Sequence, residues 1–116
     1  MVKPRQLILY AGLAIYCGFA QLASAKPPVT LSGGDGSSFR KAVVVDARDA
    51  GARAGVRAQR NYLLQHFGHW RSADSQVIMH DARMYNVVVL VTDDHKKHTV
   101  YFDISCCWAD MMTQTI

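Results

Sequence analysis

The sequence predicts a small single α+β domain in which one helix covers one face of a mostly antiparallel sheet. A β-branched run is followed by a segment with helical spacing, and then by three strand-like segments joined by short links. Short links favour antiparallel neighbours, because a parallel connection needs about a dozen residues or more. The expected order is therefore strand, helix, strand, strand, strand. The 116-residue chain, 50% hydrophobic and 19% charged, is long enough for one such domain and too short for several.

The first 25 residues are typical of a secretory signal peptide. Lys3 and Arg5 precede an apolar run over residues 7–20, and the run is followed by a small-x-small motif at residues 23–25. We therefore expect cleavage after Ala25 and a periplasmic or secreted bacterial protein. The alternative is an uncleaved membrane anchor, but a spanning helix needs about 20 apolar residues.

The charge of the chain excludes some classes of partner. The net charge is +4, but removing Lys3 and Arg5 from the 13 basic residues leaves 11 against 9 acidic residues, so the mature chain carries +2. A nearly neutral domain is not typical of nucleic-acid binding. No second apolar segment is long enough to span a membrane. We expect no nucleic-acid partner, no cofactor and no transmembrane segment in the mature chain.

The first half of the mature chain is expected to contain one strand and one helix. Residues 26–38 are predicted to be an extended lead-in, because prolines and a Gly/Ser-rich stretch favour extended chain and turns. The folded domain is expected over residues 39–116, and its first strand over Phe39–Asp46, which contains a valine run. Helical spacing of apolar residues then predicts a helix from Asp49 to Phe67. Asp46 or Asp49 is expected to cap this helix, and Gly68 to end it.

The second half of the chain is expected to form a three-stranded meander. After a loop over residues 69–75, a short strand is predicted over Gln76–His80. Met84–Thr92 is apolar on both faces, which indicates a central strand covered on both sides for part of its length. His98–Ser105 alternates, with Val100, Phe102 and Ile104 on one face. Residues 108–116 are expected to form a short helical or frayed end.

Two segments resemble small exported bacterial proteins of unassigned function. They are residues 31–38 (LSGGDGSS), which precede the valine-rich strand, and residues 100–105 (VYFDIS). Members of this kind end in an aromatic-glycine segment, where this chain has Cys106-Cys107-Trp108. The resemblance implies export and one small domain, and it implies no activity.

Three arginines are the first candidate binding residues. Arg53, Arg57 and Arg60 lie at i, i+4 and i+7 on one side of the predicted helix, and the chain has no glutamate to pair with them. Such a stripe fits an anionic surface, such as lipid headgroups or an acidic protein. The alternative is a solvated helix face whose long stems cover the edge of the core.

Tyr85, Tyr101 and Asp103 are the second set of candidate binding residues. They are expected on the sheet face that the helix leaves open, as a binding surface or a homodimer contact. The alternative for Asp103 is a surface carboxylate paired across strands with Arg or Lys. The sequence contains no nucleophile elbow, and a mature chain of about 91 residues leaves little room for a water-excluding pocket. Enzymatic activity is therefore not assigned.

Cys106 and Cys107 are the candidate redox residues, because thiols of an exported protein meet oxidants. Strand alternation would place them on opposite faces, which argues against a bridge between them. The alternative is a partly buried pair of small apolar side chains.

Histidines form two H-x-x-H pairs, His66 with His69 and His95 with His98, while His80 stands alone. Imidazoles three residues apart on a helix can share a metal ion, and Cys106 or Asp81 could add a ligand. The alternatives are a cation at a helix C-terminus and a solvated turn, and we assign no metal site.

The sequence therefore predicts an exported binding module whose partner is another periplasmic protein or an envelope component. The alternative is a small periplasmic redox or metal-handling protein that uses Cys106, Cys107 and the histidines.

Overall fold

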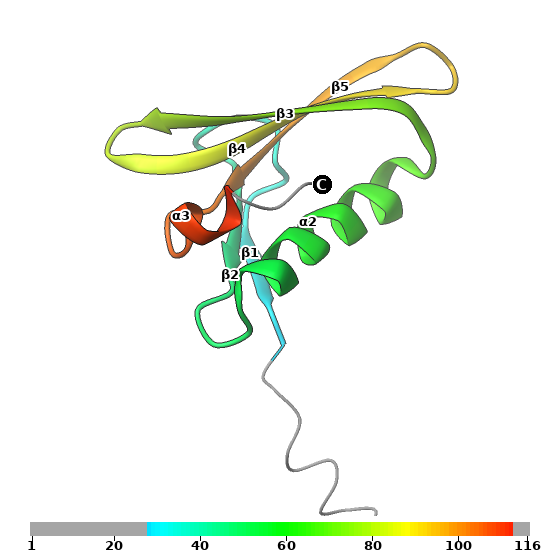
Figure 1. The fold of residues 1–116 in the computed structure, drawn as a ribbon. Helices are drawn as coiled ribbons and strands as arrows, with labels where there is room; N and C mark the ends of the chain where they lie inside the picture. The colour runs from blue at the N-terminus through cyan, green and yellow to red at the C-terminus, as the bar shows by residue number, and fades with distance from the viewer. Residues whose placement is uncertain (1–27, 113–116) are drawn as a thin grey trace, which may run out of the picture.

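Five strands form one sheet in the order β1-β2-β5-β4-β3 in the computed structural model of the chain, which describes residues 28–112 (Figure 1). The strands are β1 (Thr30–Gly33), β2 (Val43–Asp46), β3 (Trp70–His80), β4 (Arg83–Thr92) and β5 (Lys97–Asp103). The helices are α2 (Ala52–Phe67) and the short α3 (Trp108–Met111). The predicted signal peptide, residues 1–25, lies outside the described residues. Between residues 28 and 112, no helix has the length and apolar character needed to cross a membrane.

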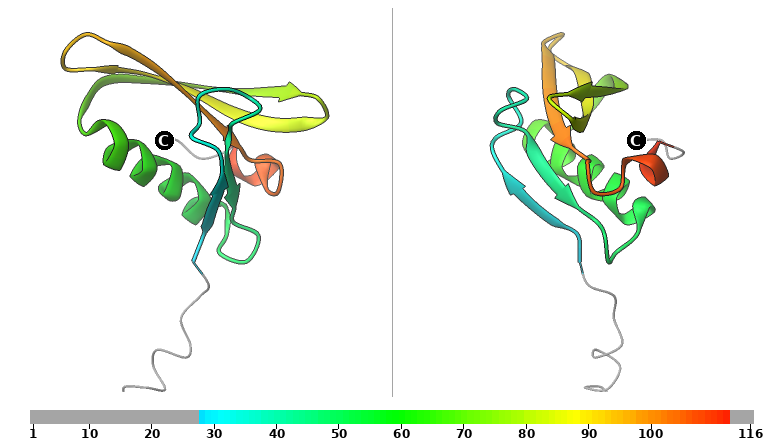
Figure 2. Two further views of the ribbon diagram at one scale, coloured as in Figure 1. Left: turned by 180° about the vertical axis from the view of Figure 1, so that it is seen from behind. Right: turned by 90° about the vertical axis from the view of Figure 1, so that its left-hand side faces the viewer.

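The strand directions confirm a mostly antiparallel α+β fold. β3, β4 and β5 form the expected antiparallel meander, and β1 is antiparallel to β2. β2 and β5 pair in parallel, through Val43 with Phe102 and Val44 with Asp103. The helix between β2 and the meander makes this parallel pairing possible, because it carries the chain back across the sheet. α2 and α3 lie on the same side of the twisted sheet (Figure 2).

Two segments expected to be irregular form strands. Residues 30–33 of the predicted lead-in are the edge strand β1, paired with β2 over four residues. The predicted loop over residues 69–75 is also wrong, because β3 begins at Trp70. The polar residues of this segment pair with Val88–Val91 of β4 and point to solvent at the sheet edge. Tertiary pairing with a strongly β-forming neighbour therefore overrides their weak strand propensity.

Helix α2 begins without the expected aspartate cap. Gly51 occupies the N-cap position, and no side chain of the described part of the chain caps the helix. The carboxylate of Asp46 instead accepts hydrogen bonds from Arg48, from Nε at 3.0 Å and from an η nitrogen at 2.8 Å. Gly68 does end the helix, as predicted, and its N–H donates to the carbonyl of Leu64 at 2.9 Å.

The hydrophobic core lies between the sheet and the two helices. Its largest fully buried side chains include Phe102 of β5, Leu63 of α2 and Leu90 of β4. Met111 anchors α3 to the same core, close to the backbone of Gly55. The alternation expected for β5 is confirmed, because Val100, Phe102 and Ile104 all point into this core. On the opposite side of the sheet, which we call the outer face, residues 28–112 place no helix.

The loop over residues 34–42 joins β1 to β2 and packs against the side of β5. The N–H of Tyr101 donates to the carbonyl of Gly36 at 2.8 Å, which continues the sheet beyond the end of β2. Gly36 has a φ of +81°, and a side chain there would collide with Val100. This tight approach brings Phe39 onto the outer face, where its ring contacts Tyr85 and Tyr101.

Candidate functional site

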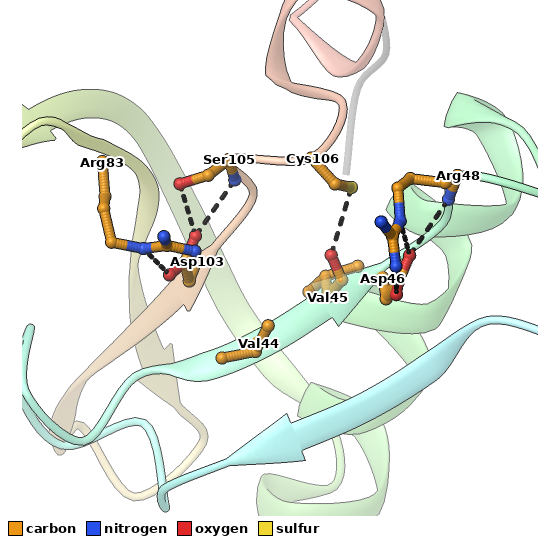
Figure 3. A pocket seen from close by; sticks show the side chains of 8 residues that line it. All are labelled: Val44, Val45, Asp46, Arg48, Arg83, Asp103, Ser105 and Cys106. Carbon is orange, nitrogen blue, oxygen red and sulfur yellow. Dashed lines mark hydrogen bonds and ion pairs between the residues drawn. The ribbon is translucent and has the colours of Figure 1, made fainter.

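Strand register places a row of side chains across the outer face. Val44 of β2 is opposite Asp103 of β5, and Asp103 is opposite Tyr85 of β4. Arg83 lies two residues before Tyr85 on the same strand and therefore on the same face. Next to this row lies a hollow of about 360 Å³ (Figure 3). It is lined by Val44, Val45, Asp46, Arg48, Arg83, Asp103, Ser105 and Cys106.

Asp103 is the centre of the hydrogen bonding in this hollow. Its Oδ2 accepts from Nε of Arg83 at 2.6 Å. Its Oδ1 accepts from the hydroxyl of Ser105 at 2.6 Å and from the N–H of Ser105 at 3.0 Å. The Asp103 side chain is only 7% exposed, whereas that of Arg83 is 53% exposed. The cross-strand pairing considered as the alternative for Asp103 is therefore present, and Arg83 supplies the cation.

Arg83 is anchored in a way that leaves most of its donors available. Only its Nε bonds to Asp103, and no hydrogen bond joins its two terminal nitrogens to any residue in the described range 28–112. Arg48, on the same rim, differs because both Nε and a terminal nitrogen are bound to Asp46. An arginine fixed through Nε presents its terminal nitrogens as a planar fork that matches a carboxylate or a phosphate.

The charges around Arg83 favour an anion. A second hollow of about 520 Å³ shares Val44, Arg83 and Asp103 with the first, and Arg40 and Lys41 contribute to its lining. We call the two connected hollows the outer-face groove. Its lining residues include four cationic side chains against the carboxylates of Asp46 and Asp103. This excess of positive charge attracts anionic groups.

Opposing effects act on the ionisation of Asp103. Burial disfavours the carboxylate, but hydrogen bonds from Arg83 and Ser105 outweigh burial and hold the pKa of Asp103 below its usual value of 3.8. The same hydrogen bond and the charge of Asp103 raise the pKa of Arg83. Both groups are therefore ionised at neutral pH.

This lowered pKa predicts a loss of stability in acid. A carboxylate with a lower pKa in the folded state stabilises the fold above about pH 4 and loses that contribution as the pH falls through its folded-state pKa. We expect the free energy of unfolding to decrease between about pH 5 and pH 3, and the decrease to be smaller in Asp103→Asn. Urea denaturation across this range measures both. Asp49→Asn, in the exposed turn before α2, should keep the wild-type slope.

An aromatic cluster lies at one end of the outer-face groove. Phe39 contacts Tyr85 and Tyr101 edge-on, with ring centroids 4.9 and 4.8 Å apart, and stacks on His80 at 4.1 Å. Tyr85 is buried in this cluster and Tyr101 is half-buried. The two tyrosines therefore support the groove wall instead of forming an open platform. The prediction that Phe39 begins the first strand is wrong, because β2 starts at Val43 and Phe39 lies in the loop before it. The position of Phe39 above the tyrosines depends on this loop.

The arginine stripe lies elsewhere. Arg53, Arg57 and Arg60 are exposed on α2, on the helix side of the sheet, while Arg83 and Asp103 lie on the outer face. Arg60 lies over the ring of Trp70, with its guanidinium carbon 5.4 Å from the centroid. The structure thus separates the two predicted groups of binding residues.

Cys106 and Cys107 form a disulfide, contrary to the expectation that they point to opposite faces. The expectation assumed that the strand continues through them, but β5 ends at Asp103 and residues 105–107 form a turn. The alternation rule does not apply in a turn. Sγ of Cys106 lies 3.3 Å from the carbonyl oxygen of Val45, at the end of the outer-face groove (Figure 3).

Three histidines from the two H-x-x-H pairs line another hollow, of about 440 Å³. His66, His69 and His98 share it with Asp93 and Asp94. Among residues 28–112, no three His, Cys, Asp or Glu side chains are grouped closely enough to hold a metal ion. His95 instead contacts Arg71 at 3.0 Å, and His80 belongs to the aromatic cluster.

Comparison of the chain with protein-family models, with curated proteins and with solved structures found no match.

Proposed function

We propose that this protein is an exported binding module that holds an oxyanion of its partner, a carboxylate or a phosphate, in the outer-face groove. The observation that carries this proposal is the state of Arg83, whose Nε is anchored by the buried Asp103 while its terminal nitrogens have no partner within the described residues. An anchored guanidinium loses less conformational freedom on binding than a free one, so more of its interaction energy contributes to affinity. Arg40 and Lys41 add the charge that attracts the ligand.

The partner that fits this site is another periplasmic protein or an envelope component with an exposed acidic group. The charged, apolar and small-x-small parts of residues 1–25 support export to the bacterial periplasm or the medium. A disulfide between Cys106 and Cys107 is in keeping with an oxidising compartment.

Isothermal titration of the purified protein with inorganic phosphate, and separately with succinate, tests the proposal and distinguishes the two kinds of oxyanion. We expect saturable binding of at least one of them, with a dissociation constant of about 1 mM for such a small ligand. Arg83→Gln, which keeps a polar side chain and removes the charged fork, should weaken binding at least about tenfold.

The matched control is the triple variant Arg53→Gln/Arg57→Gln/Arg60→Gln, which removes three positive charges from α2 and leaves the groove intact. It should bind as the wild type does. Weaker binding in this variant together with full binding in Arg83→Gln would show that the anion binds at α2 and not in the groove. If neither anion saturates the wild-type protein, the proposed oxyanion site is rejected.

A second candidate function is thiol–disulfide exchange. It is favoured by the observed bond between Cys106 and Cys107, together with the exposure of Cys106. In this reaction a thiolate of a partner dithiol attacks one sulfur of the Cys106–Cys107 bond, which forms a mixed disulfide and frees the other cysteine as a thiolate. The partner's second thiolate then attacks the partner's own sulfur in the mixed disulfide, which closes the partner's disulfide and frees the second cysteine. The partner becomes the disulfide, and Cys106 and Cys107 become thiols.

Incubation with reduced dithiothreitol, followed by mass spectrometry of alkylated protein, tests this second candidate. A redox role predicts rapid conversion to the doubly alkylated form and return to the disulfide in air. Resistance to the reductant in the folded state would reject it.

A further inference from the structure

The long strand β3 forms one complete edge of the sheet. The strand order places it beyond β4, and the described residues 28–112 contain no strand on its other side. It has 11 residues, and most of them, including the whole run 71–76, are exposed. Along such an edge, every second residue directs its N–H and C=O groups away from the sheet. Figure 1 shows β3 running across the top of the molecule, well beyond the start of the helix.

β3 lacks the features that normally prevent edges from pairing. Proteins protect long edges with proline, lysine, bulges or very short strands. From Ser72 to Met79 the strand contains no proline, glycine or lysine, and Asp74 is its only charged residue. Its one irregularity of register lies at the start, between Trp70 and Ser72. Met79, near the other end, is 69% exposed although it is apolar.

The opposite edge of the same sheet is protected. β1 has only four residues, and Gly33 ends it with a φ of +86°. The unprotected edge β3 is therefore the one expected to pair with a partner strand, and the protected edge β1 is expected to stay unpaired.

One antiparallel register of β3 with a second copy of itself places an acidic residue opposite a histidine on each side of its centre. When Val77 lies opposite Val77 of a second copy, Asp74 of each chain lies opposite His80 of the other. Asp74 and His80 are an even number of positions apart and therefore lie on the same face of β3. His80 is opposite Arg83 of β4, so this is the outer face. On the helix side, Ser75 then lies opposite Met79. A carboxylate and an imidazole directly opposite each other across strands stabilise the pairing.

We propose that two copies of this protein associate through β3, antiparallel and centred on Val77, so that their sheets become one continuous sheet. A two-fold axis at Val77 makes the two Asp74–His80 contacts equivalent, as a closed symmetric dimer requires. The interface lies on the edge opposite β1 and does not use Arg83 or Asp103, although His80 also stacks on Phe39 at one end of the outer-face groove. It therefore stands independently of the proposed anion binding.

Analytical ultracentrifugation of the exported protein over a concentration series tests the dimer. We expect a reversible dimer in the wild type. Ser75→Lys/Met79→Lys should be monomeric, because both positions are exposed in the single chain and each would place a lysine opposite a lysine across the interface. The control Ser32→Lys, on the protected edge β1, should remain dimeric.

A charge exchange keeps the test independent of folding defects. Asp74→Arg should raise the dimer dissociation constant at least about fivefold, and Asp74→Arg/His80→Asp should restore it. A wild-type protein that stays monomeric at the highest concentration, a partner found only on β1, or a double lysine variant that dimerises normally would overturn the proposal.

Discussion

Replacing Asp103 by alanine is expected to lower the free energy of unfolding by about 2 kcal/mol and to weaken anion binding at least about tenfold. Asp103 accepts one hydrogen bond from Arg83 and two from Ser105, and its side chain is almost completely buried. Its removal leaves the turn after β5 without its main side-chain acceptor. It also frees the guanidinium of Arg83, so that the fork must be ordered again when a ligand binds.

Urea denaturation measures the change in stability, and titration with phosphate or succinate measures the change in binding. The control is Asp46→Ala, which removes the other ion pair on the rim of the outer-face groove. Asp46 and Arg48 are exposed, and exposed pairs contribute little to stability. We expect this control to unfold like the wild type. If Asp103→Ala and Asp46→Ala are equally stable, the hydrogen bonds of Asp103 do not stabilise the fold as proposed.

The second large effect is expected in the core, where Gln59 and Asn86 form a buried polar pair. Nδ2 of Asn86 donates to Oε1 of Gln59 at 2.8 Å, whereas Oδ1 of Asn86 has no hydrogen-bond partner within the described residues. Gln59→Leu removes the hydrogen-bond partner of the Asn86 side-chain amide. Because an unsatisfied buried amide keeps its full desolvation cost, we expect a loss of about 2–3 kcal/mol in the free energy of unfolding.

The double variant Gln59→Leu/Asn86→Leu should recover most of that loss, because it replaces both polar groups by apolar ones in the same core. A double-mutant cycle in urea measures the coupling between the two positions. A double variant less stable than Gln59→Leu would show that the amide pair itself stabilises the fold.

Much of the fold could be predicted because the apolar pattern matches burial in space. The alternation of β5 and the apolar run of β4 are read directly from the sequence, and both strands meet the core. On β4 this holds for the face of Val88 and Leu90, whereas the valines of its other face are only half-buried. β1 and the first half of β3 could not be predicted in this way. Both are exposed edge segments of polar residues, and their strand conformation depends on pairing with β2 and β4.

The candidate site was predicted only in part. Asp103 was predicted as a candidate binding residue because it is a carboxylate between Tyr101 and Ser105 on one face of an alternating strand. The structure places it at the centre of the hydrogen bonding in the outer-face groove. Arg83 was not predicted as a site residue. It directly follows the two-residue turn at Asp81 and Ala82, so the sequence pattern assigns it to the connection between two strands. Only the register of β4 with β5 brings its side chain to Asp103.

The cysteine pair illustrates the same dependence on local conformation. Whether Cys106 and Cys107 can bond depends on where β5 ends, and that end is set three residues earlier, at Asp103. No count or spacing of cysteines contains this information.

The most direct test of the oxyanion site follows Arg83 itself in the wild-type protein. Its Nε–H resonance, assigned by comparison with Arg83→Gln, can be monitored by NMR while phosphate or succinate is added. Anion binding at the terminal nitrogens predicts a saturable shift of this resonance, together with the backbone amides of Arg40, Lys41 and Ser105. Saturable shifts confined to the amides of residues 53–60, with the Arg83 resonance unmoved, would contradict the account.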